Sequence, residues 1–295
     1  MSFRSGLVSL AGRSNVGKST LLNAMVGKKL SIVTHKPQTT RYRVSGIRNS
    51  ADAQIVFIDA PGLHRSSGKA LNQMMNRTAL QTISEGDLVL FVVEAFRWTE
   101  EDQDMLGHLQ AQQTPVILVA NKVDQVKPRE KLLPLLQQLA ERGEFAEVVP
   151  LSATRGHNLE RLSDVIVSHL PEGPPLYPAD MDSDRDDRFH VAELIREQLT
   201  LRLQQELPYG VAVSVEALDV GDELVRISAI VWVEREPQKA IVIGKGGQML
   251  KGIGSAARRD LERHFGRKVH LELWAKVRNR WSDNIDDLAR FGHDT

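Results

Sequence analysis

Residues 12–19 of this 295-residue chain read Gly-Arg-Ser-Asn-Val-Gly-Lys-Ser, the complete G-x-x-x-x-G-K-[ST] pattern of a phosphate-binding loop. An apolar stretch over 7–10 predicts a buried strand before the loop. Three apolar residues at helical spacing predict a helix over 19–26 after it. Backbone N–H groups of such a loop point at phosphates, and the helix N-terminus adds to the attraction. A chance glycine-rich turn is the alternative, and the strand–loop–helix setting argues against it.

Four residues of the loop have predicted roles in holding a nucleoside triphosphate. Gly12 and Gly17 let the backbone curl around the phosphates. Lys18 places a compact positive charge against the terminal phosphates, and Ser19 offers a hydroxyl to Mg²⁺. The loop therefore predicts a nucleotide-binding domain.

Length and composition are those of a globular protein with about two domains. Hydrophobic residues make up 41% of the chain and charged residues 26%, which excludes disordered and fibrous classes. No cysteine is present, so disulfides, thiolate catalysis and cysteine zinc sites are excluded, and a reducing compartment is favoured. We expect no secretory signal before Gly12. The longest apolar run, 88–93, is too short to span a membrane and predicts a buried strand.

Charge is balanced overall but unevenly distributed. The formal net charge is zero, whereas residues 239–280 contain eleven Lys and Arg against three acidic residues. A local surplus of basic residues is typical of a surface that binds nucleic acid.

A second nucleotide motif, D-x-x-G, follows the predicted strand 53–58. Asp59 is placed to hold the Mg²⁺ shell through water, and Gly62 to offer its backbone N–H to the γ-phosphate. The motif is weak evidence by itself. About forty residues after a phosphate loop, and directly after an apolar strand, it becomes strong.

A third motif identifies the base. The predicted strand 116–120 ends in Asn121-Lys122-Val123-Asp124. The carboxylate of Asp124 only accepts hydrogen bonds, so it pairs with the N1–H and N2–H donors of guanine, whereas adenine has an acceptor at N1. Ser152 and Ala153, just after the predicted strand 147–151, complete the base pocket by their position.

Alternating strands and helices predict the fold of this part of the chain. Further helices are expected near 102–109 and over 158–170. Strands that alternate with helices predict an α/β domain with a parallel, doubly wound sheet, whose ligands bind at the carboxyl ends of the strands.

A linker and a second domain follow. Residues 171–188 contain a Pro/Gly-rich turn and an acidic run, so we predict domains over 1–170 and 189–295, the second with a C-terminal helix. Apolar periodicity over 191–277 gives the order helix–strand–strand–helix–GXXG–helix–strand, that of an α+β, type-II KH domain.

The GXXG loop is Gly244-Lys245-Gly246-Gly247, and such loops clamp the backbone of about four nucleotides. A second phosphate loop is excluded because no Lys-Ser/Thr closes the motif and a short helix precedes it. Lys251 and Arg258 are candidate phosphate contacts, although part of the basic run is explained equally well as a solvated helix face. Trp232, Trp274 and Trp281 either stack on bases or, as is commoner, fill the core. No histidine pair has metal-ligand spacing.

The finer sequence resembles the Era family of bacterial GTPases over about residues 5 to 285. The resemblance rests on the loop 12–23, on Lys36-Pro37-Gln38-Thr39-Thr40-Arg41, on Asp59 to His64, and on 238–247 with Leu271-Glu272-Leu273-Trp274. Ser14 and Ala60 depart from the usual Pro and Thr of that family. Leu63 stands where Ras-like GTPases have a water-orienting Gln, which implies slow intrinsic turnover.

The resemblance implies a Mg²⁺-dependent GTPase switch, with K⁺ held near Asn15, although Asn15 is equally explained as a loop-stabilising amide. It implies an RNA partner, the 3′ end of 16S ribosomal RNA in the 30S subunit, and no DNA. It further implies a cytoplasmic location with a peripheral inner-membrane contact. The implied catalytic residues are Lys18, Thr40 and Gly62, and the Mg²⁺ ligands are Ser19, Thr40 and Asp59. The implied GTP-binding residues are Gly12, Asn15, Val16, Gly17, Lys18, Ser19, Thr20, Asp59, Gly62, Asn121, Lys122, Asp124, Ser152 and Ala153. The implied RNA-binding residues are Gly244, Lys245, Gly246, Gly247, Lys251 and Arg258.

Two alternative functions stand beside this one, a different enzyme and a protein of another class. A GTPase that assists tRNA modification lacks support because the C-terminal cysteine usual in that family is missing. A membrane- or protein-interaction module whose KH fold has lost RNA is disfavoured by the basic surplus around the GXXG loop.

Overall fold

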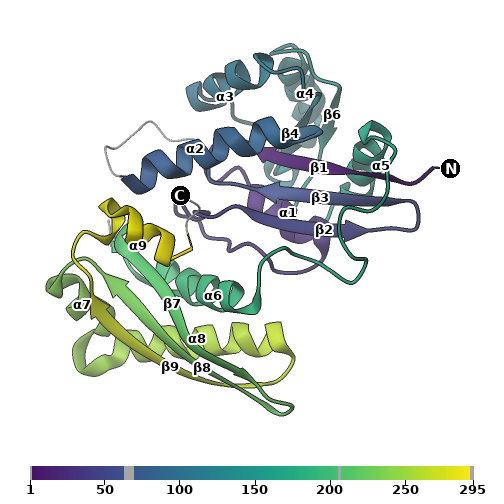
Figure 1. The fold of residues 1–295 in the computed structure, drawn as a ribbon. Coiled ribbons are helices and arrows are strands. Elements are labelled where there is room, and N and C mark those ends of the chain that lie inside the picture. The colour runs from purple at the N-terminus through teal and green to yellow at the C-terminus, as the bar shows by residue number, and fades with distance from the viewer. Residues whose placement is uncertain (1, 63–69, 205–206, 293–295) are drawn as a thin grey trace. The chain divides into compact units, whose positions relative to one another are not determined.

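The computed structural model describes residues 2–62, 70–204 and 207–292 (Figure 1). The chain forms two compact units. The first comprises Met1–Ser31, Thr40–Arg65 and Met75–Asp184, and the second comprises Ile32–Thr39, Ser66–Met74 and Arg185–Thr295. Each unit has its own sheet and its own hydrophobic core.

The first unit is built on a six-stranded sheet with the order β2-β3-β1-β4-β5-β6. All neighbours pair in parallel except β2, which runs antiparallel to β3 at the edge. The α/β prediction is confirmed, with this one antiparallel edge strand added. The strands are β1 (Arg4–Ala11), β2 (Val44–Asn49), β3 (Ala53–Asp59), β4 (Leu88–Glu94), β5 (Val116–Asn121) and β6 (Glu147–Pro150).

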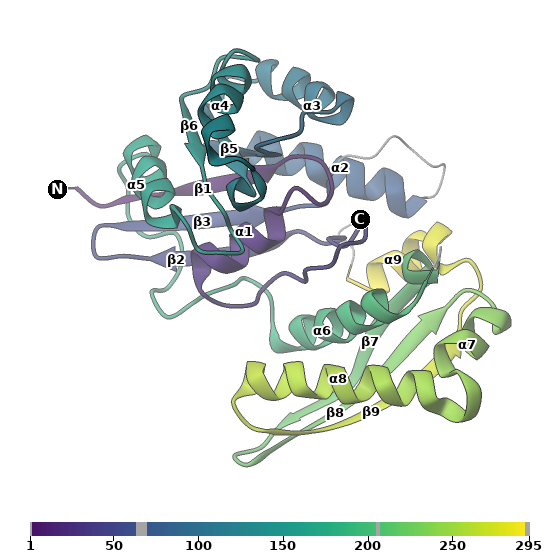
Figure 2. The ribbon, with the colours of Figure 1, turned by 180° about the vertical axis from the view of Figure 1, so that it is seen from behind.

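Helices cover both faces of this sheet (Figures 1 and 2). Helices α1 (Lys18–Val26) and α5 (Leu159–His169) lie on one face. The other face packs against α2 (Ala70–Glu85), α3 (Glu100–Gln110) and α4 (Leu132–Ala140). Every residue of β4 is buried, as expected for a strand covered on both sides. Full burial of such a Val or Leu side chain contributes roughly 1.5–3 kcal/mol.

Two of these helices were not predicted. In α2 the buried apolar residues recur every fourth position, at Leu71, Met75, Ala79 and Ile83. That spacing is a helical signal, but polar residues between them obscure it. In α4, Pro134 breaks the expected pattern; it lies in the first turn, where its missing N–H costs no helical hydrogen bond.

Part of the predicted linker packs along the edge of the sheet. The side chain of Gln54 accepts from the backbone N–H groups of Leu176 and Tyr177 at 2.7 and 2.9 Å. Ser45 donates through its backbone N–H and hydroxyl to Asp184 at 3.1 and 2.9 Å. These contacts explain why the first compact unit extends to Asp184, beyond the predicted domain limit at 170.

The second unit has a three-stranded sheet in the order β7-β8-β9, with β7 antiparallel and β9 parallel to the central strand. Alternate residues of the strands form its core with three helices, as the KH prediction required. The elements are α6 (Asp187–Arg202), β7 (Val211–Val220), β8 (Leu224–Val233), α7 (Glu236–Ile243), α8 (Gln248–Phe265), β9 (Lys268–Val277) and α9 (Ile285–Arg290).

The three tryptophans of this unit have different environments. Trp281 is fully buried and donates from its indole N–H to the carbonyl of Gly210 at 3.2 Å, so it is a core residue. Trp232 is partly buried, 6.0 Å from the ring of Phe291 after α9. Trp274 is 46% exposed on β9. Of the three, Trp274 is the most exposed.

No helix in the described part of the chain is long and apolar enough to cross a membrane.

Candidate functional site

The phosphate loop lies between β1 and α1 with the backbone that its pattern predicts. Gly12 and Gly17 have φ angles of 140° and 105°. A Cβ atom on Gly12 would lie 2.4 Å from the carbonyl oxygen of Val92, and one on Gly17 would lie 2.4 Å from the amide nitrogen of Asn121. Both positions therefore need glycine, for the backbone angle and for the space. Asn15 also has a positive φ, 65°, and its side chain is exposed.

Lys18 points back across the loop. Its ammonium group donates to the carbonyls of Gly12 and Arg13 at 2.7 and 3.0 Å. The residue is 7% exposed, and burial lowers the pKa of Lys18 to about 8, although the nearby charge of Asp59 opposes the shift. A buried ammonium beside a loop of backbone amides is suited to pair with phosphate oxygens.

Oxygen atoms gather beside the loop, around Asp59 at the end of β3. Ser19 and Ser31 donate hydroxyl hydrogen bonds to Asp59 Oδ2 at 2.6 and 2.8 Å, and the hydroxyls of Ser19 and Thr40 are 2.9 Å apart. Burial raises the pKa of Asp59, opposed by the charge of Lys18 and by these hydroxyls. Asp59 Oδ1 is buried and has no hydrogen-bond partner among the described residues. A carboxylate oxygen beside two hydroxyls is the donor set that Mg²⁺ prefers, so these residues fit the metal.

The predicted base-recognition motif contacts the phosphate loop directly. The amide nitrogen of Asn121 donates to the carbonyl of Val16 at 2.8 Å, and its oxygen accepts from the backbone N–H of Ala153 at 3.1 Å. Lys122 donates to the carbonyl of Asn15 at 2.7 Å. Asn121 thus joins three of the predicted motifs in one hydrogen-bond network. Parallel strands bring them together because β1, β3 and β5 end at the same edge of the sheet.

The residues predicted to bind the base line a cavity, and ligand cavities of about 300–1,000 Å³ use a few polar groups to orient a small organic molecule. Asp124 and Ser152 line a cavity of about 540 Å³ with Val123, Arg155 and His157. Asp124 is exposed, so its acceptor atoms are accessible. The size and the acceptors suit a guanine base.

The remaining residues predicted to bind GTP lie in the phosphate loop, at the start of α1 or close beside the loop. Val16 is fully buried, and Thr20 lies partly buried in α1 next to Ser19. A Cβ atom on Gly62 would lie 3.3 Å from the backbone nitrogen of Ser14, so the D-x-x-G turn closely approaches the phosphate loop. Leu63 and His64 lie outside the described residues.

In the second unit the GXXG loop joins α7 to α8. Gly244, Gly246 and Gly247 have φ angles of 73°, 58° and 78°, and a Cβ atom on Gly246 or Gly247 would meet nothing within 4 Å. These two positions therefore leave the backbone open to a ligand. Lys245, directly before these two glycines, is exposed. An open, glycine-rich turn at a helix N-terminus with one lysine is suited to a sugar–phosphate backbone.

A cavity of about 360 Å³ continues from this loop, between α8 and the edge strand β9. Lys251 and Arg258 lie on the helix side with Ser255, and Leu271 and Leu273 lie on the strand side. The two predicted RNA-binding side chains therefore share one groove with Gly247. Charge lines one wall and apolar surface the other, a combination that suits a nucleotide with its phosphate and base.

Sequence reasoning missed several polar residues of the first unit. Ser31 is not among the predicted site residues, yet its hydroxyl contacts Asp59. Arg13, Glu94 and Asp102 form buried ion pairs beside the phosphate loop. Two signals were available: Glu94 is a charged residue at the end of an otherwise apolar strand, and Thr99-x-x-Asp102 is a capping-box pattern.

Comparisons with known proteins agree with this geometry. Residues 7–122 match the family model described as a 50S ribosome-binding GTPase, and residues 206–282 match that of a KH domain. The chain is 48% identical over 289 residues to GTPase Era of Stenotrophomonas maltophilia, covering 98% of this chain and 97% of that one. It is 46% identical over 292 residues to GTPase Era of Azotobacter vinelandii, covering 99% and 97%.

Two solved structures share the whole fold at 38% identity. One is a crystal structure of Era in complex with MgGDPNP and nucleotides 1506–1542 of 16S ribosomal RNA, with a TM-score of 0.94 and coverage of 99% of this chain and 100% of that one. The other is an Aquifex aeolicus Era variant bound to GDP·AlF₄⁻, with a TM-score of 0.95 and the same coverage.

Fold and sites together define a phosphate-loop GTPase joined to a KH domain. Nearly half of the residues are identical to those of the relatives over almost their full length, which identifies the family within this class. The chain belongs to the GTPase Era family.

Proposed function

We propose that this protein is a GTP-hydrolysing switch that grips the 3′ end of 16S ribosomal RNA through its KH domain and assists assembly of the 30S subunit. One observation supports the GTP-binding part of this proposal above all. The side chain of Asn121 hydrogen-bonds both to the phosphate loop and to the Ser152–Ala153 segment. The RNA part is supported by the open GXXG loop and its adjoining groove, and by a full-length relative solved with nucleotides 1506–1542 of 16S ribosomal RNA.

In the nucleotide site, the phosphate loop from Gly12 to Thr20 receives the phosphates, with Lys18 as the charged contact and the backbone of Gly62 beside the γ-phosphate. Asp124, Asn121 and Ala153 orient guanine, with Lys122 and Ser152 beside it. Ser19, Thr40 and Asp59 hold Mg²⁺, and the unpartnered Oδ1 of Asp59 supports this assignment. When bound, the metal neutralises negative charge on the phosphate oxygens.

The protein's own contribution to catalysis is positioning and electrostatic stabilisation. Phosphoryl transfer needs little covalent help, so a fixed ammonium from Lys18 and fixed backbone N–H groups stabilise charge as it develops. The catalytic roles proposed for Thr40 and Gly62 follow from their predicted places beside the metal and the γ-phosphate. K⁺ binding near Asn15 stays a prediction from the family resemblance, as do the cytoplasmic location and the peripheral membrane contact.

In the KH unit, the proposed RNA path runs from the GXXG loop along the groove between α8 and β9. Gly244 to Gly247 hold the backbone, and Lys251 and Arg258 pair with phosphates. RNA contacts of this kind release counterions, so binding falls steeply with salt.

Binding experiments test both halves of the proposal. GTP titrated into the protein should displace a fluorescent GDP analogue, whereas ATP should not at the same concentration. An RNA oligonucleotide covering the 3′ end of 16S ribosomal RNA should bind more tightly than the same nucleotides in scrambled order. Equal affinity for the two RNAs would contradict the ribosomal-RNA part and leave the GTPase part standing.

A further inference from the structure

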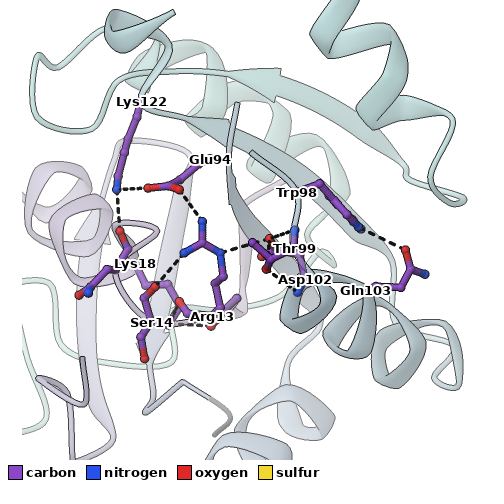
Figure 3. A network of polar contacts seen from close by, with 11 residues as sticks. Arg13, Ser14, Lys18, Glu94, Trp98, Thr99, Asp102, Gln103 and Lys122 are labelled. Atoms are coloured by element: carbon purple, nitrogen blue, oxygen red, sulfur yellow. Dashed lines mark hydrogen bonds and ion pairs between the residues drawn. The ribbon is translucent and has the colours of Figure 1, made fainter. Parts of the chain in front are cut away.

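Four charged side chains join the phosphate loop to two neighbouring segments of the first unit (Figure 3). Arg13 forms an ion pair with Glu94 Oε2 and a second one with Asp102 Oδ2, whose Nε–Oδ2 distance is 3.2 Å. Lys122 forms an ion pair with the other carboxylate oxygen of Glu94. Glu94 therefore bridges Arg13 of the phosphate loop and Lys122 of the base-recognition motif, with one oxygen for each.

The four groups are charge-balanced, and three of them are largely removed from water. Arg13 and Glu94 are each 8% exposed, and Asp102 is fully buried. Burial acts to raise the pKa of Glu94, but the hydrogen bonds and charges of Lys122 and Arg13 outweigh it and hold that pKa below its ordinary value. Glu94 is thus a carboxylate between two cations. Replacing it with a neutral group leaves the buried Arg13 with Asp102 as its ion-pair partner, and Lys122 with its hydrogen bond to the carbonyl of Asn15.

The position of Glu94 follows from the order of the strands. It is the last residue of β4, the strand between β1 and β5, and its Cα pairs in register with that of Asn121. The phosphate loop leaves β1 on one side, and the base-recognition motif leaves β5 on the other. A carboxylate at this point lies between two loops that are more than a hundred residues apart in the chain.

Arg13 is also anchored from its other side. Asp102 Oδ2 accepts from the backbone N–H and the hydroxyl of Thr99, both at 2.9 Å, in the capping box that begins α3. The guanidinium is therefore fixed between the end of a strand and the start of a helix. Because Asp102 also caps α3, substituting it would disturb the helix, and Glu94 is the better residue to test.

We propose that Glu94 is a positioning residue of the nucleotide site. Its carboxylate holds Arg13 and Lys122 so that the phosphate loop and the guanine-binding motif keep the separation that one nucleotide spans. This inference rests on the proposed GTP site. In this proposal Glu94 contacts neither the phosphates nor the base. It acts through Arg13 of the phosphate loop and Lys122 of the base-recognition motif.

The test is Glu94→Gln, which keeps the shape of the side chain and removes its charge. We expect the dissociation constants for GDP and GTP to rise about tenfold or more, mainly through faster dissociation in stopped-flow displacement of a fluorescent GDP analogue. Single-turnover hydrolysis at saturating GTP should change less than threefold, because Lys18, Thr40 and Asp59 are untouched. Such a split between binding and chemistry would not result from a purely structural role.

The matched control is Glu101→Gln, the same chemical change on an exposed residue in the first turn of α3. It should bind nucleotide like the parent. Circular dichroism should show that each variant is folded at the temperature of the measurement. A folded Glu94→Gln that binds GDP with parental affinity and dissociation rate overturns the proposal. Failure of the parent itself to bind guanine nucleotides would overturn the proposed function instead.

A second variant covers the case in which Glu94→Gln does not fold. Combining Arg13→Gln with Glu94→Gln removes one charge of each sign, so the net charge of the four positions stays zero, and Asp102 keeps its hydrogen bonds from Thr99. We expect this double variant to fold and still to bind GDP about tenfold more weakly, because neutral amides hold the loop less firmly than an ion pair. Parental affinity in the folded double variant also overturns the proposal.

Discussion

The side-chain amide of Asn121 donates to the carbonyl of Val16 at 2.8 Å, a contact between residues 105 positions apart. Its oxygen accepts from the backbone N–H groups of Lys122 and Ala153 at 2.8 and 3.1 Å. One buried side chain therefore satisfies three backbone groups in three segments. The loop that receives phosphates and the segments that receive the base are held in register before any nucleotide binds.

Asn121→Ala should destabilise the protein strongly. The change leaves three backbone groups without their side-chain partner in a site that is 2% exposed. We expect the free energy of unfolding to fall by roughly 2–4 kcal/mol, measured by urea denaturation without nucleotide. The control is Asn49→Ala at an exposed position, which removes a hydrogen bond donated to Ala179 and one accepted from Gln54 and should cost about 1 kcal/mol. Equal losses in both variants would show that the Asn121 bridge adds no special stability.

Asp124→Asn should change base preference from guanine toward xanthine. The amide can donate to the C2 oxygen of xanthine, whereas it meets the N1–H and N2–H donors of guanine with a donor of its own. We expect GTP affinity to fall by about two orders of magnitude or more and XTP affinity to rise, in competition binding. Asp124 is exposed in its cavity, so thermal unfolding of the nucleotide-free variant should match that of the parent. Unchanged preference for GTP would remove Asp124 from the base pocket.

GDP affinity should decline above about pH 8. Burial lowers the pKa of Lys18 to about 8 in the nucleotide-free protein. Phosphates favour the ammonium form, so binding at higher pH must take up a proton. The dissociation constant should stay level with respect to this group from pH 7 to 8 and rise by up to about tenfold per pH unit beyond.

The control for this pH dependence is Lys18→Arg, whose guanidinium stays charged across the range. It should bind more weakly at every pH because the geometry differs, but with a flatter profile. Ionisation of the guanine base affects parent and variant alike and therefore cancels in the ratio of their dissociation constants. A constant ratio from pH 7 to 9 would contradict the lowered pKa of Lys18.

Replacing Lys245 and Gly246 by Asp should abolish RNA binding without affecting GTP. The two carboxylates repel the phosphate backbone, and Gly246 has a φ of 58°, a backbone conformation that residues with a Cβ atom rarely adopt. The loss should persist at low salt, since it removes the close contact as well as the long-range attraction. RNA titration at two ionic strengths measures it.

This experiment has one control variant and one control for folding. Arg263→Ala removes one exposed cation of α8 that is paired with Asp260 and does not line the groove, so its effect should be small and recovered at low salt. Circular dichroism should show that the double Asp variant keeps its fold. If that variant is folded and binds RNA like the parent, the GXXG loop is only a turn.

The sequence by itself determined the class of the protein. Phosphate-loop, D-x-x-G, N-K-x-D and GXXG motifs are short, and each carries its own backbone requirement, such as the positive φ of Gly17 or Gly247. Strand and helix periodicity then placed those motifs at the ends of elements. Such patterns depend only on residues close together in the chain. The order of elements in the second unit was predicted from them, whereas α2 and α4 of the first unit were not.

The tertiary structure alone decided how distant segments meet. Nothing local reveals that β2 runs antiparallel at the edge, or that Asp184 and Tyr177 of the predicted linker bond to β2 and to its neighbour β3. The same holds for Arg13 and Glu94, whose ion pair joins residues 81 positions apart. Charge pairing depends on which side chains the folded sheet brings within a few ångströms and shields from water. Strand order set by the whole chain, and not the sequence near either residue, determines that pairing.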